Sequence, residues 1–131
     1  MTEVIKIPYP KTMAGKKEWN KRYGLNAYWK GKHFHERAED ARFWHALTKV
    51  AMDSAHCRKH PFENPVVVSF AWNDHLDLDN HSIMGKMILD AMKGRVFPDD
   101  SRRWLKGIEH YWHDADYIRV EIREVEHDRK G

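Results

Sequence analysis

The sequence has a single cysteine, Cys57, which excludes an internal disulfide and the paired-cysteine spacing of most structural zinc sites. It has no apolar run near the roughly 18 residues that a membrane-spanning helix needs. Its first residues lack the charged-then-apolar order of a signal peptide. These absences predict a protein of the reducing cytoplasm without a membrane partner.

Internal repeats and low-complexity segments are absent as well. Hydrophobic residues make up 41% of the chain and charged residues 33%, a balance typical of a globular domain. A length of 131 residues predicts one domain over residues 1–131, with a polar tail at residues 126–131. A core of this size would gain from dimerisation.

The net charge is low, at +3, and the isoelectric point is about 9.0. Acidic residues in a central stretch lower this sum, so the rest of the surface is more basic than the total indicates. This mild basic bias fits a polyanionic partner without requiring one.

The apolar patterns predict a short series of elements joined by loops. We expect strands at residues 3–9 and 66–73, helices at residues 36–56 and 80–93, and a hairpin of residues 103–112 with 117–125. Residues 11–35 show no clean period and are predicted to be a long loop. The order predicts an α/β (α+β) fold, a small mixed sheet with two main helices packed on it.

Within the first long helix, the pattern predicts Phe43, Trp44 and Val50 on the buried side and Asp40 on the exposed side. Alternation in the strand at residues 66–73 predicts a buried Trp72.

Two acidic pairs bracket the central stretch, Asp77 with Asp79 and Asp99 with Asp100. An apolar pattern at helical spacing lies between them, with Asp79 or Asn80 as the expected N-cap. A short helix with carboxylates at both ends could bring those acids together. Carboxylate oxygens suit Mg²⁺, although caps and turns explain such aspartates equally well.

Two more charged residues follow on this helix. Lys86 and Asp90 stand seven and eleven positions after Asp79, so a regular helix returns them to within about 20° of its direction. A lysine on that face can neutralise a phosphate or orient a water.

These motifs resemble the RusA family of Holliday junction resolvases. The likeness rests on Asp77-Leu78-Asp79-Asn80, Lys86, Asp90-Ala91-Met92-Lys93-Gly94, Asp99-Asp100, and an N-terminal stretch at Leu25-Asn26-Ala27-Tyr28-Trp29. It extends to a strand before the central motif and a strand pair after it, and so covers nearly the whole chain.

The resemblance implies a homodimer that binds four-way DNA junctions and nicks two strands symmetrically in recombination and repair. It implies Asp77, Asp79 and Asp100 as catalytic Mg²⁺ ligands, with Asp99 as the second choice for Asp100 and Mn²⁺ as a substitute metal. Lys86 would be the catalytic lysine. No small-molecule cofactor is implied, and the origin would be a bacterium or a phage.

The spacing of the lysine departs from the family pattern. The family lysine usually follows Asp-Asn by three residues, whereas residues 81–85 intervene here, as though three residues were inserted. This departure motivates an alternative, a junction-binding accessory protein of the same fold that cleaves poorly.

Basic and aromatic residues elsewhere suit DNA, because lysines meet phosphates and rings stack on bases. The candidates are Asn26, Tyr28, Trp29, Lys30, Lys32, Arg102 and Arg103. A solvated loop with its aromatics folded onto the core is the alternative.

The ten histidines suggest a zinc site as an alternative. Its candidate ligands are His56, Cys57 and His60, which lie close together in the sequence. One cysteine without paired spacing makes this a minor alternative. Nothing in the sequence pairs Cys57 with a base, so we do not expect it to be a nucleophile.

Overall fold

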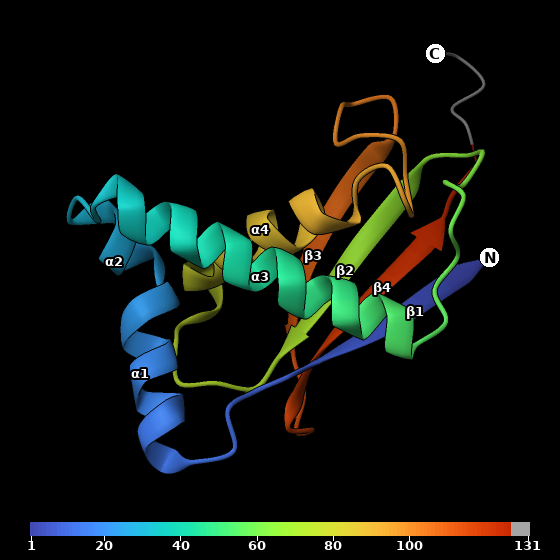
Figure 1. Ribbon diagram of the computed structural model, residues 1–131. Helices are drawn as coiled ribbons and strands as arrows, with labels where there is room; N and C mark the ends of the chain where they lie inside the picture. The colour runs from blue at the N-terminus through green and yellow to red at the C-terminus, as the bar shows by residue number, and fades with distance from the viewer. Residues whose placement is uncertain (127–131) are drawn as a thin grey trace.

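The computed structural model describes residues 1–126, which form a four-stranded sheet with helices packed against it (Figure 1). In chain order the elements are β1 Thr2–Pro8, α1 Met13–Tyr23, α2 Leu25–Trp29, α3 Phe34–Ser54, β2 Val66–Trp72, the 3-10 helix η1 Leu78–His81, α4 Ser82–Met92, β3 Leu105–Trp112 and β4 Tyr117–Glu124. The polar tail predicted at residues 126–131 lies, from residue 127 on, outside the described residues.

The sheet is mixed, in the order β1-β4-β2-β3. Strand β4 pairs antiparallel with both β1 and β2, whereas β3 runs parallel to β2. The predicted small mixed α/β sheet is therefore confirmed.

The predicted hairpin of residues 103–112 with 117–125 is wrong. Both strands exist, but β2 lies between them, and the connection at residues 113–116 crosses the end of β2. Strand β2 is apolar on nearly every residue, so burial favours a central place with partners on both edges. The connecting residues also lack the glycine that tight hairpin turns favour.

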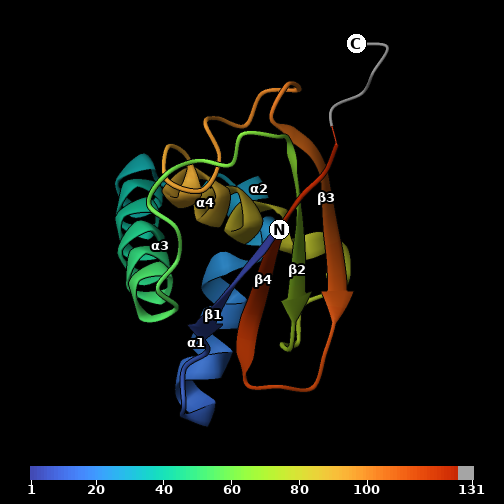
Figure 2. The same ribbon diagram turned by 90° about the vertical axis from the view of Figure 1, so that its right-hand side faces the viewer.

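Helices cover one face of the sheet, and the opposite face is left open (Figure 2). Inward side chains of the two inner strands, β2 and β4, are fully buried, as the alternation predicted: Val66, Val68, Phe70, Trp72, Ile118, Val120 and Ile122. From the helices, Trp44, Met84 and Ile88 complete this core at 0% exposure. Among the described residues, no helix has the length and apolar character needed to cross a membrane.

The loop predicted at residues 11–35 is wrong, because α1 and α2 occupy most of it. Thr12 caps α1, its hydroxyl accepting a hydrogen bond from the Gly15 amide at 2.9 Å. Only Trp19 and Tyr23 of α1 are buried, and both pack edge-on against Trp44. Two buried residues in eleven give too weak a period to reveal a helix in the sequence.

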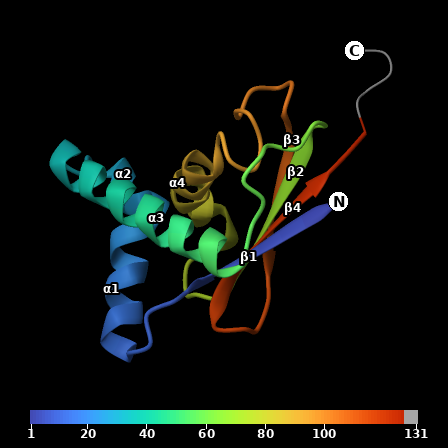
Figure 3. The same ribbon diagram turned by 45° about the vertical axis from the view of Figure 1, so that its right-hand side comes forward.

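Helix α3 turns a different side to the core than its pattern predicts. Asp40 is fully buried, whereas Phe43 and Val50 are 45% and 63% exposed. The first half of α3 extends beyond the sheet to lie against α1 and α2 (Figure 3). Phe43 stacks on Tyr23 there, and a charged network surrounds Asp40.

Candidate functional site

The acidic motif lies in the connection from the end of β2 to α4. Asp77 precedes η1 with extended backbone angles, and Asp79 lies within η1. The α-helix begins only at Ser82, so the predicted N-cap at Asp79 or Asn80 is wrong. A 3-10 turn has three residues per turn, so it breaks the angular register that linked Asp79 to the helix.

Both side chains of this motif are open to solvent. Asp77 and Asp79 are exposed, and within residues 1–126 neither carboxylate makes a hydrogen bond or an ion pair. They follow the end of an inner strand, beside the start of α4. Two unpaired carboxylates in such a place are suitable ligands for a hard cation.

His81 fixes this segment to the body of the protein. Its ring is fully buried, and Nε2 lies 2.8 Å from each carboxylate oxygen of Asp74. Asp74 also accepts a hydrogen bond from the Tyr9 hydroxyl at 3.1 Å, and that hydroxyl accepts one from the Asn73 amide at 2.8 Å. The His81–Asp74 pair was not predicted from the sequence, where the only signal for it is a histidine in the segment between Asn80 and Lys86.

Helix α4 and the loop after it carry a chain of alternating charges. Lys86 Nζ lies 3.3 Å from Asp90 Oδ2, and Lys93 Nζ lies 3.2 Å from Asp90 Oδ1 and 3.6 Å from Asp100 Oδ2. The predicted face is thus confirmed for Lys86 with Asp90. It is wrong for Asp79, which lies in η1 and not in the α-helix.

A hollow of about 310 Å³ opens between α4 and the edge strand β3. Lys86, Asp90 and Asp100 line it, together with Ile108 and His110, and we call it the Lys86 hollow. Asp77 and Asp79 are not among its lining residues. The structure therefore brings Lys86 and Asp100 to one place without the first acidic pair.

His110 is the titratable ring of this hollow. Its Nδ1 accepts a hydrogen bond from the Trp72 indole nitrogen at 3.0 Å. Burial lowers the pKa of His110, and the neighbouring His81 lowers it further. Because Nδ1 is the acceptor of the indole hydrogen bond, the ring proton lies on the second nitrogen.

Asp99 and Asp100 differ in their surroundings. The Asp99 carboxylate accepts a hydrogen bond from the Ser101 amide at 2.8 Å, and the Ser101 side chain and amide lower its pKa. Among residues 1–126, the Asp100 carboxylate pairs with Lys93 alone. Of the pair, Asp100 is the one facing the Lys86 hollow.

The acidic side chains of the described residues fit a preformed metal centre only in part. Within residues 1–126, no three side chains of aspartate, glutamate, histidine or cysteine gather into a group that could hold an ion. Asp77 and Asp79 fit the one or two carboxylates that Mg²⁺ commonly takes from a protein. Asp100 is not gathered with them.

The N-terminal candidates for DNA contact fall into two groups. Asn26, Trp29 and Lys30 are exposed, whereas Tyr28 and Lys32 both bind the buried Asp40. The side chain of Lys32 is only 6% exposed. Its ammonium is therefore bound inside the protein.

Asp40 accepts three donors. Arg22 Nε lies 2.8 Å from Oδ1, and the Tyr28 hydroxyl and Lys32 Nζ each lie 2.5 Å from Oδ2. Burial alone would raise the pKa of Asp40, but the hydrogen bonds from Lys32, Tyr28 and Arg22 outweigh it and lower the pKa. Burial and the bond to Asp40 raise the pKa of Tyr28.

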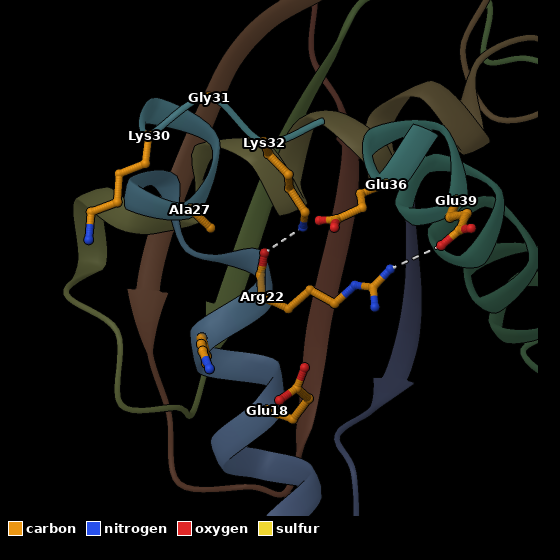
Figure 4. Close-up of a pocket in the computed structure, with 9 residues that line it drawn as sticks. Glu18, Arg22, Ala27, Lys30, Gly31, Lys32, Glu36 and Glu39 are labelled. Atoms are coloured by element: carbon orange, nitrogen blue, oxygen red, sulfur yellow. Dashed lines mark hydrogen bonds and ion pairs between the residues drawn. The ribbon is translucent and has the colours of Figure 1, made fainter. Parts of the chain in front are cut away.

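An open hollow of about 440 Å³ lies beside this network, between α1, α2 and α3 (Figure 4). Lys32 points to the carbonyl oxygen of Arg22, and the Arg22 side chain reaches toward Glu39 at 3.6 Å. Lys21 and Lys30 also line it, so four cations face three glutamates.

The remaining candidates lie on the surface. Arg102 and Arg103 are exposed in the loop before β3, and the guanidinium of Arg103 lies over the Trp104 ring at 5.1 Å. Cys57 is buried, and burial raises the pKa of its thiol. His56 and His60 form no metal group with Cys57 in the described residues.

The fold and this site define a small mixed α/β protein with two exposed aspartates after the central strand. A scan against protein-family models found no match, and a search of curated proteins found none either.

Proposed function

We propose that the protein is a metal-dependent endonuclease that resolves branched DNA, in the manner that the RusA resemblance implies. The observation that carries the proposal is the Asp77-Leu78-Asp79-Asn80 motif, whose two carboxylates are exposed and unpaired after the central strand. A hydrolase acting on phosphate needs such carboxylates accessible to a cation and to the substrate together.

Asp77 and Asp79 would hold Mg²⁺, or Mn²⁺ in its place, with Asp100 as a third ligand by resemblance and Asp99 as its second choice. When bound, the ion would make a water more acidic and stabilise the charge that develops on phosphorus. The two carboxylates are acceptors only and leave the remaining coordination positions to water and to phosphate oxygens.

Lys86 is assigned the role of pairing with the phosphate. Its side chain is 68% exposed, and in the described part of the chain its ammonium pairs only with Asp90, at 3.3 Å. An exposed pair of this kind contributes little stability, so a phosphate oxygen can replace Asp90 as the partner. In that position Lys86 would stabilise the transition state.

Exposed basic and aromatic residues supply the contacts to DNA. Asn26, Trp29 and Lys30 lie at one end of the molecule, and Arg102 and Arg103 lie beyond α4. Lysine and arginine would bind phosphates, which fixes the register of the duplex without reading its sequence. A homodimer would present two such sites to opposing strands of one junction.

A second candidate is a junction-binding accessory protein that cleaves poorly. It is favoured by one observation: Lys86 shares its hollow with Asp100 but not with Asp77 or Asp79. A lysine that acts apart from the first acidic pair would bind DNA without assisting cleavage there.

One experiment separates the two candidates. A synthetic four-way junction is incubated with the protein in Mg²⁺ for cleavage, and in Ca²⁺ for a gel shift. The endonuclease proposal expects paired nicks in Mg²⁺ and a retarded complex in Ca²⁺, with linear duplex of the same sequence as the control substrate. A tight complex without nicks in Mg²⁺ or Mn²⁺ supports the accessory protein.

A further inference from the structure

Aromatic side chains are exposed where α2 leads into α3. Trp29 is 84% exposed and Phe34 is 59% exposed, which is unusual for large apolar residues on a small domain. This end of the molecule projects away from the sheet in two views (Figures 1 and 3). We call residues 29–35 the aromatic tip.

The rings of His33, Phe34 and His35, at the start of α3, contact one another. The ring centroid of Phe34 lies 5.1 Å from that of His33 and 4.0 Å from that of His35, with interplanar angles of 27° and 35°. All three residues are exposed, and the Phe34 ring remains accessible to solvent although both histidine rings contact it. Flat, accessible π-faces are what an unpaired base stacks on.

The tip is held firmly from within. Gly31 provides the turn with a φ of +88°, a value that other residues rarely adopt. On either side of it, Tyr28 and Lys32 are both bonded to the buried Asp40. Lys32 Nζ also donates to the Arg22 carbonyl oxygen at 2.8 Å. A rigid platform loses little conformational entropy when it binds a base.

Two lysines carry the open positive charge beside the tip. Arg22 and Lys32 are paired with the buried Asp40, which leaves Lys21 and Lys30 of the cations that line the adjacent hollow. Lys30 is exposed next to Trp29, and it lines the hollow of Figure 4 together with Lys21. Glu18 lines the same hollow from α1 and Glu36 and Glu39 line it from α3, so the positive charge nearest to Trp29 is that of Lys30. This charge is complementary to a phosphate backbone.

We propose that the aromatic tip binds unpaired nucleotides, with Trp29 and Phe34 stacking on bases and Lys30 on a neighbouring phosphate. The inference deepens the proposed function, since it names the single-stranded bases of branched DNA as what the tip recognises. It does not depend on cleavage, because stacking needs neither the acidic motif nor Lys86.

The test measures binding of a fluorescein-labelled oligothymidylate by anisotropy, in Ca²⁺. An abasic oligonucleotide of equal length is measured beside it, because it has the same phosphates and no bases. Trp29→Ala is expected to weaken binding of the oligothymidylate by about 5- to 100-fold, the range for loss of one stacked base. Phe34→Ala acts in the same direction, and Trp29→Phe restores most of the affinity.

Two controls keep the result specific. Tyr111→Ala removes an aromatic ring that is 52% exposed on β3, and it should leave both affinities unchanged. Lys30→Ala should weaken binding of both oligonucleotides alike, because it removes a phosphate contact. Circular dichroism of each variant establishes that the fold is retained.

The outcomes are separable from those of the proposed function. If Trp29→Ala weakens binding of the oligothymidylate but not of the abasic oligonucleotide, base stacking by the aromatic tip is supported, even if the wild-type protein cleaves no junction. Equal binding by wild type and Trp29→Ala, equal loss on both oligonucleotides, or no binding by wild type would each overturn it. If the wild-type protein nicks junctions at the same time, the endonuclease proposal stands without the tip.

Discussion

His81 Nε2 lies 2.8 Å from both carboxylate oxygens of Asp74, and His81 Nδ1 lies 3.0 Å from the carbonyl oxygen of Leu78. Carboxylate and carbonyl oxygens are hydrogen-bond acceptors, so each ring nitrogen of His81 faces an acceptor. The buried pair joins the end of β2 to the turn that carries Asp77 and Asp79. His81, in the segment between Asn80 and Lys86, therefore has a structural role.

His81→Ala should lower the free energy of unfolding by about 3–5 kcal/mol, since it leaves a cavity in place of a buried ring and removes the ring's hydrogen bond to Asp74. Urea unfolding followed by tryptophan fluorescence measures this change. His75→Ala is the matched control, because His75 is an exposed histidine of the same connection. A loss below about 1 kcal/mol for His81→Ala would mean that the pair does not hold this turn.

Asp40→Ala should destabilise the protein by a similar amount, about 3–5 kcal/mol, because Lys32 would remain buried without a counter-charge. Glu39→Ala is its control, since Glu39 is 61% exposed and 3.6 Å from Arg22. Its expected effect is below about 0.5 kcal/mol. Equal effects in the two variants would contradict the account of the Asp40 network.

Glu109 should make stability depend on pH in the acid range. Hydrogen bonds from Ser69, Arg123 and Tyr111 lower its pKa from 4.5 to about 2. Because the folded-state pKa is depressed, the contribution of Glu109 is fully present above pH 4.5 and is lost as pH falls toward about 2.

Denaturant unfolding at several pH values tests this dependence. The difference in unfolding free energy between wild type and Glu109→Gln should be constant above pH 4.5 and shrink below it. Glu63→Gln, at an exposed position, serves as the control. A difference that does not change between pH 6 and pH 3 would rule out the pairing.

Lys86→Ala should slow junction cleavage by about 10²- to 10³-fold, as the loss of one transition-state donor does, and leave binding in Ca²⁺ nearly unchanged. Lys49→Ala is a closely matched control, because Lys49 makes the same kind of exposed pair with Asp53, four residues on, at 2.9 Å. Cleavage by Lys86→Ala at the wild-type rate would contradict the role of Lys86 in cleavage. If the wild-type rate is itself slow, the same result would favour the accessory protein over the endonuclease.

Much of the fold can be predicted from the periodic spacing of apolar residues in the sequence. The strand around Phe70 and the helix around Ile88 were predicted closely, because both bury a continuous stripe against the core. Strand order was not predictable from β3 and β4 themselves, since the burial of β2 decided it. Local patterns carry no information on which distant strand inserts between two neighbours.

The site was predicted less completely. Spacing identified the Lys86–Asp90 pair, which depends only on helical geometry. It did not identify Asp40, a charged residue whose burial depends on three donors from other segments. It also placed Asp79 on the helix, because a 3-10 turn before an α-helix leaves no distinct pattern in the sequence.

The rate at which Asp79→Asn cleaves a four-way junction in Mg²⁺ tests the central claim most directly. Asp114→Asn is the control, because Asp114 is also exposed and lies in the connection between β3 and β4. We predict that Asp79→Asn loses at least about 100-fold in rate while Asp114→Asn keeps the wild-type rate. Cleavage by Asp79→Asn as fast as by wild type would contradict the assignment of the acidic motif.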